Sequence, residues 1–236
     1  MKRDFLIALN IKNNLIDEKV YFENLKESEL KSIIFPSFLQ LKDVFFDKNR
    51  KIELGVQDLQ IDNLTITGEV KACDLKQFDV KYSIVGHSER RYKLFETSEV
   101  VSKKITESLD NKITPVLCVG ELEQTENIKL VFEFLDSQIK ESLGNCFNRQ
   151  KDIILAYEPV FAIGTGVSCD IEHIESVIDY IKDNYNFNEV LYGGSVNVNN
   201  CKEIYNIKNL DGFLIGSASL DYNKINKIYD LIENEK

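Results

Sequence analysis

Short apolar runs recur along the chain and alternate with longer stretches that have the spacing of amphipathic helices. The apolar runs lie at Phe5–Leu9, Ser32–Phe35, Ile52–Val56, Tyr82–Val85, Ile113–Val119, Ile153–Tyr157, Val190–Tyr192 and Phe213–Ile215. The helical spacing is clearest at Val100–Leu109, Ile128–Leu143, Ile171–Tyr185 and Asn223–Ile232. Strands that alternate with helices in this way predict a parallel sheet with helical crossovers.

Eight such units in 236 residues have the size of a closed (β/α)₈ barrel of the TIM type, with eight parallel strands inside a ring of helices. The chain has no low-complexity segment and no linker rich in Pro, Gly or Ser, so we expect residues 1–236 to form a single domain. An open, doubly wound sheet is the alternative. Such a sheet often carries a G-x-G-x-x-G motif after its first strand, and here Asn10–Asn14 stands in that place.

Polar and glycine residues follow most of the predicted strands. They are Asn10 and Lys12 after the first, Gln57 after the third, Gly86 and His87 after the fourth, Cys118, Gly120 and Glu121 around the end of the fifth, Glu158 after the sixth, Gly193–Ser195 after the seventh, and Gly216 and Ser217 after the eighth. In a barrel, the carboxyl ends of all strands meet on the face that carries active sites. We therefore expect these groups to converge, although they lie far apart in sequence.

Glu158 stands where a buried strand meets Pro159 and a glycine-containing loop, and a desolvated carboxylate there would be a stronger base than in water. His87 precedes Ser88-Glu89-Arg90-Arg91, which can start a helix with Ser88 as its cap. A helix N-terminus favours the neutral imidazole, which can donate a hydrogen bond to a carbonyl oxygen. The alternatives for single residues are a solvent-facing or ion-paired glutamate, a hydrogen-bonded structural histidine and, for Lys12, a solvated surface lysine.

Backbone N–H groups in glycine turns can hold a phosphate without a side chain in the way. The candidates are Gly164, Gly194, Ser195, Gly216 and Ser217, with Lys12 adding a fixed positive charge. Together with Glu158 and His87, these groups supply what is needed to remove a proton next to the carbonyl of a small phosphorylated substrate.

The net charge of −10 disfavours nucleic acids and anionic membranes as partners. The five cysteines form no C-x-x-C pair and only two histidines are present, so we expect reduced thiols and no metal site. We expect Cys169 and His173 to pack at the start of a helix. The sequence from Met1 runs directly into an apolar strand without the features of a signal peptide, and no apolar run could span a bilayer. We therefore expect a cytoplasmic location.

The sequence resembles the triosephosphate isomerase family. The most specific motifs are GHSERR at 86–91 and AYEPVFAIGTG at 156–166, and they are joined by LYGGSV at 191–196 and DGFLIGSASL at 211–220. Weaker matches are NIKNN at 10–14, TGEV at 67–70 and PVLCVGE at 115–121. They follow the family's order and cover the whole chain. The resemblance implies a (β/α)₈ barrel that interconverts dihydroxyacetone phosphate and D-glyceraldehyde 3-phosphate through an enediolate, in glycolysis and gluconeogenesis, without a cofactor.

The resemblance also implies a role for each matched residue. Glu158 would be the base and His87 the electrophile, with Asn10 and Lys12 as the polar groups of the first strand. Glu89 would support Lys12 and Cys118 would support the site from behind, while Pro159–Gly166 would be a closing lid. Residues Asp58–Val70 would form a loop, with Thr67 at its tip, that docks into a second subunit of a homodimer.

Several positions depart from the family's usual pattern. Ile11 and Asn13 replace the Trp and Met of the first motif, and Phe161 stands where the lid usually has Trp. Ser217 replaces the second glycine of the last phosphate turn, and Asp58 replaces an asparagine. None of these changes removes a catalytic group. Two other hypotheses are a different barrel enzyme of phosphosugar metabolism and a barrel that has lost activity and serves as a scaffold. Neither requires Lys12, His87 and Glu158 together.

Overall fold

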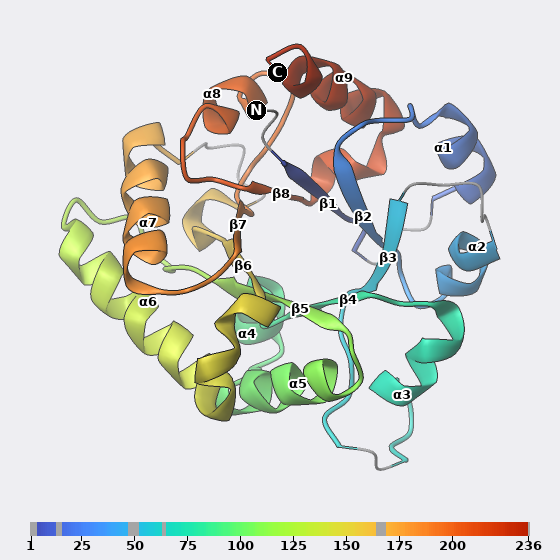
Figure 1. The fold of residues 1–236 in the computed structure, drawn as a ribbon, viewed down its shortest axis with the longest axis horizontal. Coiled ribbons are helices and arrows are strands. Elements are labelled where there is room, and N and C mark those ends of the chain that lie inside the picture. Colours follow the sequence, from blue (N-terminus) through green and yellow to red (C-terminus); the bar gives the residue numbers. More distant parts are fainter. Residues whose placement is uncertain (1–3, 13–15, 47–51, 63–64, 164–168, 236) are drawn as a thin grey trace.

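The computed structural model describes residues 4–12, 16–46, 52–62, 65–163 and 169–235. Within these residues, eight parallel strands close into a barrel in chain order, because β1 pairs with β2 on one side and with β8 on the other (Figure 1). The predicted (β/α)₈ barrel is therefore confirmed. The strands are β1 (Leu6–Asn10), β2 (Lys31–Phe35), β3 (Ile52–Val56), β4 (Tyr82–Val85), β5 (Thr114–Val119), β6 (Ile154–Tyr157), β7 (Glu189–Tyr192) and β8 (Gly212–Ile215).

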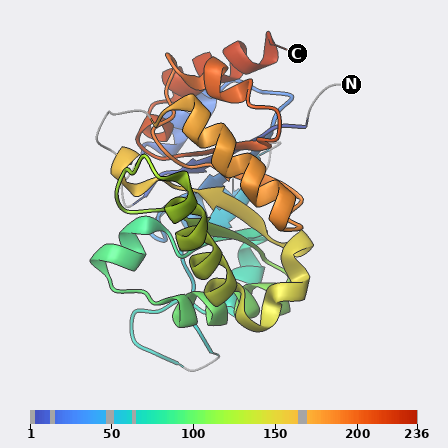
Figure 2. The same ribbon diagram turned by 90° about the vertical axis from the view of Figure 1, so that its left-hand side faces the viewer.

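Helices surround the ring of strands on its outside, and α6 and α7 lie side by side in both ribbon views (Figures 1 and 2). The α-helices are α1 (Glu18–Asn24), α2 (Leu41–Phe46), α3 (Ala72–Leu75), α4 (Ser88–Lys93), α5 (Ser98–Asp110), α6 (Ile128–Leu143), α7 (Ile171–Asn184), α8 (Cys201–Tyr205) and α9 (Tyr222–Glu233). Short 3₁₀ helices are η1 (Lys76–Phe78), η2 (Gly144–Asp152), η3 (Val160–Ala162) and η4 (Ser217–Leu220). Among these described helices, none combines the length and apolarity that crossing a membrane requires.

Side-chain caps explain where several of the longer helices begin. Thr97 accepts a hydrogen bond from the N–H of Val100 at the start of α5, and Asp170 accepts from the first turn of α7. Asp221 caps α9 in the same way. These side chains satisfy N–H groups that have no partner within the helix, so the helix starts are set by local sequence.

Alternation along each strand divides the core into two layers. The barrel interior is filled by small and branched side chains, among them Leu6, Ala8, Ile154 and Ala156. The residues between them, such as Ile7 and Leu155, pack outward against the helices in a larger cluster. Because successive side chains of a strand point to opposite faces, the polar residue two positions beyond an interior residue also points inward. This alternation determines which polar residues point into the barrel at the ends of its strands.

Candidate active site

The two strands that carry Asn10 and Glu158 aim them at the same space. In β1, the interior series Leu6 and Ala8 continues to Asn10, and in β6 the series Ile154 and Ala156 continues to Glu158. Both polar groups lie at the carboxyl end of the barrel and both are buried. The barrel interior therefore ends in a polar layer made from strands that are far apart in sequence.

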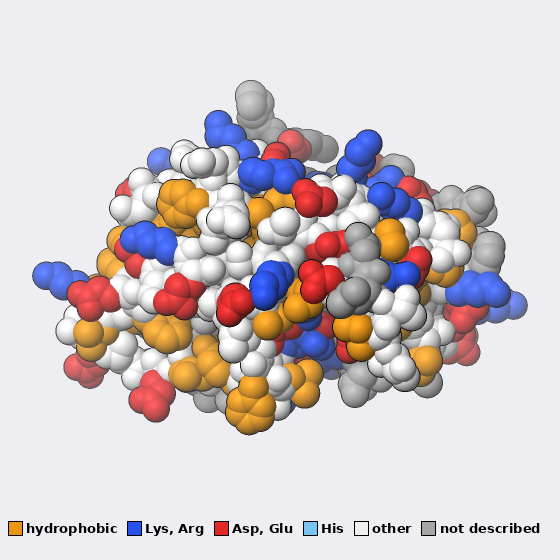
Figure 3. Space-filling model, turned by 90° about the horizontal axis from the view of Figure 1, so that it is seen from below, with side chains coloured by type: hydrophobic (Ala, Val, Ile, Leu, Met, Phe, Trp, Pro, Cys, Tyr) orange, Lys and Arg blue, Asp and Glu red, His pale blue; other side chains and the backbone are white. Residues whose placement is uncertain are grey.

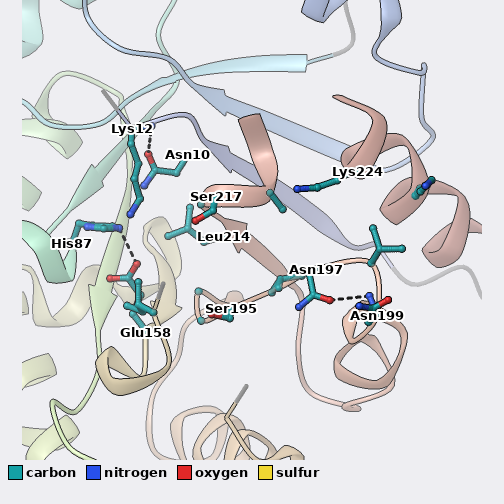
Figure 4. A pocket seen from close by; sticks show the side chains of 18 residues that line it. Asn10, Lys12, His87, Glu158, Ser195, Asn197, Asn199, Leu214, Ser217 and Lys224 are labelled. Atoms are coloured by element: carbon teal, nitrogen blue, oxygen red, sulfur yellow. Dashed lines mark hydrogen bonds and ion pairs between the residues drawn. The ribbon is translucent and has the colours of Figure 1, made fainter. Parts of the chain in front are cut away.

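A cavity of about 560 Å³ opens at this end of the barrel. Its lining brings together eight of the candidate catalytic and phosphate-binding residues predicted from sequence: Asn10, Lys12, His87, Glu158, Gly194, Ser195, Gly216 and Ser217. Figure 4 shows Lys12, His87 and Glu158 grouped on one side of it and Ser195 and Ser217 nearby. Gly164, the remaining candidate for phosphate binding, lies outside the described residues.

Both oxygens of the Glu158 carboxylate have protein partners. The side chain is 2% exposed. Its Oε1 lies 3.2 Å from His87 Nε2, and its Oε2 accepts a hydrogen bond of 3.0 Å from the backbone N–H of Ser88. The expectation that Ser88 caps the following helix was wrong. His87 is the cap of α4, because its own side chain accepts from the N–H of Glu89, and this frees the Ser88 N–H for Glu158.

The hydrogen bonds of His87 define its tautomer. Nδ1 accepts from the backbone N–H of Glu89 at 3.2 Å, so this nitrogen carries a lone pair and the ring is neutral. The proton then sits on Nε2, which faces Glu158 and the cavity. A neutral imidazole that presents an N–H to the cavity is suited to hydrogen-bond a substrate oxygen.

Lys12 is held in an unusual backbone conformation, with φ at 57°. Its N–H donates to Asn10 Oδ1 at 3.1 Å, and its carbonyl accepts from the side-chain amide of Gln57, which also donates to Phe35. Gln57 was expected at this face but was given no role, since a glutamine after a strand carries no chemical signal of its own. Residues that hold a lysine in the left-handed region point to a constraint imposed by function.

Lys12 forms an ion pair with Glu89 and is only partly buried. Its Nζ lies 3.1 Å from Glu89 Oε1, and both side chains are partly exposed. Burial alone would raise the pKa of Glu89, but the hydrogen bond and charge of Lys12, together with His87 and Lys93, outweigh it, so this pKa lies below its ordinary value. Glu89 therefore stays ionised and keeps the ammonium group in place, as the predicted supporting role requires.

Two glycines leave room for the base. A Cβ on Gly120 would lie 1.8 Å from the Glu158 carbonyl oxygen, and one on Gly193 would lie 2.8 Å from Glu158 Cγ. Cys118 is fully buried nearby. Burial raises the pKa of its thiol well above the ordinary value, and the charge of Glu158 raises it further. The thiol is therefore a neutral neighbour of the carboxylate and not a nucleophile.

The opposite side of the cavity is formed by the turns after β7 and β8. Ser195 uses its hydroxyl to donate to the carbonyl of Ala162 at 2.5 Å, which ties the β7 turn to the segment after Glu158. Gly216 lies beside the Lys12 side chain, since a Cβ there would be 3.5 Å from Lys12 Cε. Lys224 and Lys227 of α9 also line the cavity, and Lys224 lies across it from Glu158 (Figure 4).

Within the described part of the chain, no group of three or more His, Cys, Asp or Glu side chains is arranged to hold a metal ion. The groups that face the cavity are instead a carboxylate, an N–H-bearing imidazole, an ammonium group and backbone turns. They can move a proton and hold an anion.

Comparison with known proteins places the chain in a family. Residues 5–232 match the family model described as triosephosphate isomerase. A triosephosphate isomerase of Mesomycoplasma hyopneumoniae (strain 232) is 39% identical over 230 residues, which cover 96% of this chain and 91% of the relative.

Two further relatives carry the same name. That of Alkaliphilus metalliredigens (strain QYMF) is 41% identical over 181 residues, covering 72% of this chain and 73% of its own. That of Neurospora crassa is 34% identical over 237 residues, covering 93% and 95%. A match of this extent, on a barrel whose cavity holds the residues of the family's motifs, shows that the chain belongs to the triosephosphate isomerase family.

Proposed function

We propose that this chain interconverts dihydroxyacetone phosphate and D-glyceraldehyde 3-phosphate, with Glu158 as the base. The observation that carries the proposal is the pairing of Glu158 with a neutral, Nε2-protonated His87 in the same cavity as Lys12. A base and an electrophile in contact, next to a fixed cation, are the requirements for proton transfer beside a carbonyl group.

In the forward direction, a Glu158 oxygen removes a proton from C1 of dihydroxyacetone phosphate, and the electron pair moves to the carbonyl oxygen. The N–H of His87 hydrogen-bonds that oxygen as negative charge develops, and Asn10 and Lys12 stabilise the resulting enediolate. The proton of the C1 hydroxyl passes to the C2 oxygen, and return of the first proton to C2 gives the aldehyde. Because Glu158 Oε1 lies against His87 Nε2 and Oε2 accepts from the Ser88 N–H, the carboxylate must exchange at least one of these contacts for the substrate.

The phosphate would lie at the turns of Ser195, Gly216 and Ser217, which line the cavity with Lys12, and would be bound by their backbone N–H groups. We propose that Gly164 adds a further N–H when the lid, Pro159–Gly166, closes over the substrate. Of this segment, residues 159–163 are described and Gly164 is not.

The test is a coupled assay with dihydroxyacetone phosphate on the wild type and on Glu158→Gln. We expect the variant to fold and to lose about three orders of magnitude in kcat, because general-base catalysis is typically worth about 10²–10⁴-fold. Glu99→Gln, which removes an exposed carboxylate on α5, serves as the matched control. An inactive wild type would favour the scaffold hypothesis, and near-wild-type turnover by Glu158→Gln would rule out Glu158 as the base.

We further propose that the chain acts as a homodimer through the loop Asp58–Val70. The described parts of the loop protrude from the barrel in both ribbon views (Figures 1 and 2), and Thr67 is exposed. Neighbouring connections expose large apolar side chains, among them Leu39 at 80% and Phe95 at 84%. Figure 3 views the side on which the loop protrudes, and hydrophobic side chains reach the surface there among charged ones. A second copy of the chain would cover them.

Light scattering is expected to give twice the chain mass of 27.2 kDa. Phe95→Asp should shift the protein towards the monomer, because it places a charge in the proposed interface. Phe147→Asp, at an exposed phenylalanine of η2, should leave the mass unchanged. A fully active wild-type monomer at assay concentration would contradict the proposal.

We also propose a cytoplasmic location, which suits five cysteines that are all free. Cell fractionation tests this location.

A further inference from the structure

Three buried or nearly buried polar side chains meet on the far side of the Glu158 segment, outside the cavity lining. They are Glu121, which follows β5, Tyr157 at the end of β6, and His173 in the first turn of α7. The Tyr157 hydroxyl donates to Glu121 Oε1 at 2.8 Å. His173 Nε2 lies 3.0 Å from the same oxygen and 3.1 Å from the Tyr157 hydroxyl.

The donors in this cluster can be assigned. Burial raises the pKa of Tyr157 well above its ordinary value, and the charge of Glu121 adds to this, so the hydroxyl keeps its proton. If His173 Nε2 carried a lone pair, it would face a carboxylate oxygen at 3.0 Å without a proton between them. Nε2 therefore carries a proton and donates. Glu121 Oε1 thus accepts two hydrogen bonds, one from each ring.

Glu121 holds the chain on both sides of the catalytic carboxylate. Its side chain binds Tyr157, the residue before Glu158, and its carbonyl accepts from the N–H of Val160, two residues after Glu158, at 2.9 Å. The next residue, Phe161, packs edge-on to the His173 ring with the centroids 6.3 Å apart. The segment that carries the base therefore contacts Glu121 and His173 at Tyr157, Val160 and Phe161.

The carboxylate of Glu121 depends strongly on its two ring partners. Its second oxygen, Oε2, is buried without a hydrogen-bond partner within the described residues. A buried carboxylate with one unsatisfied oxygen is costly, so the two donors on Oε1 decide whether it stays in place. Removal of His173 would leave Tyr157 as the one side-chain donor to this carboxylate among the described residues and would open space beside Phe161.

We propose that His173 is a positioning residue for the catalytic base, acting through Glu121. It touches neither the cavity nor Glu158, but it holds the carboxylate that brackets Tyr157–Val160 and the ring of Phe161 that follows. The inference deepens the proposed function and rests on Glu158 being the base. The sequence instead favoured a packing role for His173 at the start of a helix. A residue in that role would stabilise the fold without influencing kcat.

The experiment compares His173→Leu, which removes the donor, with His173→Gln, whose amide can still donate to Glu121. We expect His173→Leu to lower kcat about tenfold while KM stays within about twofold, and His173→Gln to restore kcat to within about threefold of wild type. Hydrogen exchange of the Val160 amide should become about tenfold faster in His173→Leu alone. Ile178→Val, on the buried face of the same helix, controls for loss of packing and should change neither readout.

A double-mutant cycle with Glu121→Leu tests the route. If His173 acts through Glu121, His173→Leu should change kcat less than twofold in the Glu121→Leu background. The proposal is overturned if kcat per folded molecule is unchanged in His173→Leu, if the Gln variant is as poor as the Leu variant, or if the two effects multiply. Amide exchange needs no turnover, so an inactive wild type would refute the proposed function while the exchange data still decided the role of His173.

Discussion

At the scale of single residues, the site keeps groups in conformations that the chain alone would avoid. Lys12 has a positive φ, which costs a residue with a Cβ about 1–2 kcal/mol relative to the right-handed region. Asn10 and Gln57 compensate by binding its N–H and its carbonyl. The conformation is thus retained because it carries the ammonium group to the cavity, at some expense in stability.

This cost can be measured with two substitutions that both remove the charge. Lys12→Gly relieves the backbone, whereas Lys12→Ala keeps a Cβ in the same conformation. We expect the glycine variant to be more stable than the alanine variant by about 1 kcal/mol in chemical denaturation, and both to lose nearly all activity. Equal stability of the two variants would show that Lys12 is not strained.

Ser217 tests whether the departure from glycine matters at the last phosphate turn. The residue is exposed at the start of η4 and lines the cavity. If its N–H binds the phosphate while its side chain takes no part, Ser217→Gly should change KM less than about threefold, under about 0.7 kcal/mol. A larger change in steady-state KM would assign the hydroxyl a part in substrate binding.

At the scale of elements, a buried ion cluster joins the loop after β3 to α4 and α5. Asp58 lies 2.7 Å from Arg90 and 2.5 Å from Lys104, and Glu96 lies 2.5 Å from Lys104 and 3.2 Å from Arg90. Burial raises the pKa of Asp58 more than its two cations lower it. For Glu96, burial is outweighed by Lys104 and Arg90, and the pKa is lowered. The contributions of the two carboxylates to stability therefore change with pH in opposite directions.

Glu96→Gln should cost about 3 kcal/mol at neutral pH, since it removes one partner of a buried ion pair. Asp58→Asn should cost less than about 1 kcal/mol, because ionised Asp58 is already disfavoured by burial. The lowered pKa of Glu96 gives stability that is present above its unfolded value and lost as pH falls through the folded one. The raised pKa of Asp58 gives the reverse, a contribution lost as pH rises through it.

Denaturation curves at several pH values check this pair. The difference in stability between wild type and Glu96→Gln should shrink as the solution becomes more acidic than the ordinary range of a glutamate. A deficit of equal size for the two variants at neutral pH would contradict the assignment.

The strands and the longer helices could be predicted from sequence, and most ends lie within one or two residues. Ile52–Val56 and Tyr82–Val85 were predicted with the observed bounds, because short runs rich in apolar and β-branched residues favour strands. Short helices such as α2 and α8 were not individually recognised, since four to seven residues show too little periodicity. That residues 1–236 form a single domain stays a prediction.

The chemical groups of the site could be predicted for a related reason. Asn10 and Glu158 follow strands, and a closed barrel brings strand ends together whatever their separation in sequence. Contacts between different elements could not be predicted. The Ser88 N–H at the start of α4 reaches Glu158 because His87 is the cap, and Glu121 after β5 meets His173 in the first turn of α7. Such partners depend on tertiary geometry and leave no pattern along the chain.

At the scale of the whole molecule, the protein and its proposed substrate both carry negative charge. A net charge of −10 repels a phosphate at long range. Lys224 and Lys227 line the cavity on α9, both exposed, and Lys12 lies within it. A local positive field at the cavity can therefore guide an anion that the rest of the surface repels.

Removal of both α9 lysines by Lys224→Ala/Lys227→Ala should lower kcat/KM several-fold at low salt and leave kcat unchanged. The deficit should shrink near 0.15 M salt, where the Debye length falls to about 8 Å. Lys76→Ala/Lys129→Ala makes the same change in net charge away from the cavity and should have little effect. Equal deficits for the two double variants would attribute the effect to total charge.

Closure of the barrel between β1 and β8 has a consequence for synthesis of the protein. Leu6 pairs with Gly212, so the first strand must wait for almost the last part of the chain before its second edge is covered. Until then, a nascent chain on the ribosome exposes an apolar strand with unpaired backbone groups, which invites association with other chains. Codon changes that slow translation just before residue 212 should therefore lengthen this vulnerable interval and increase the need for chaperones.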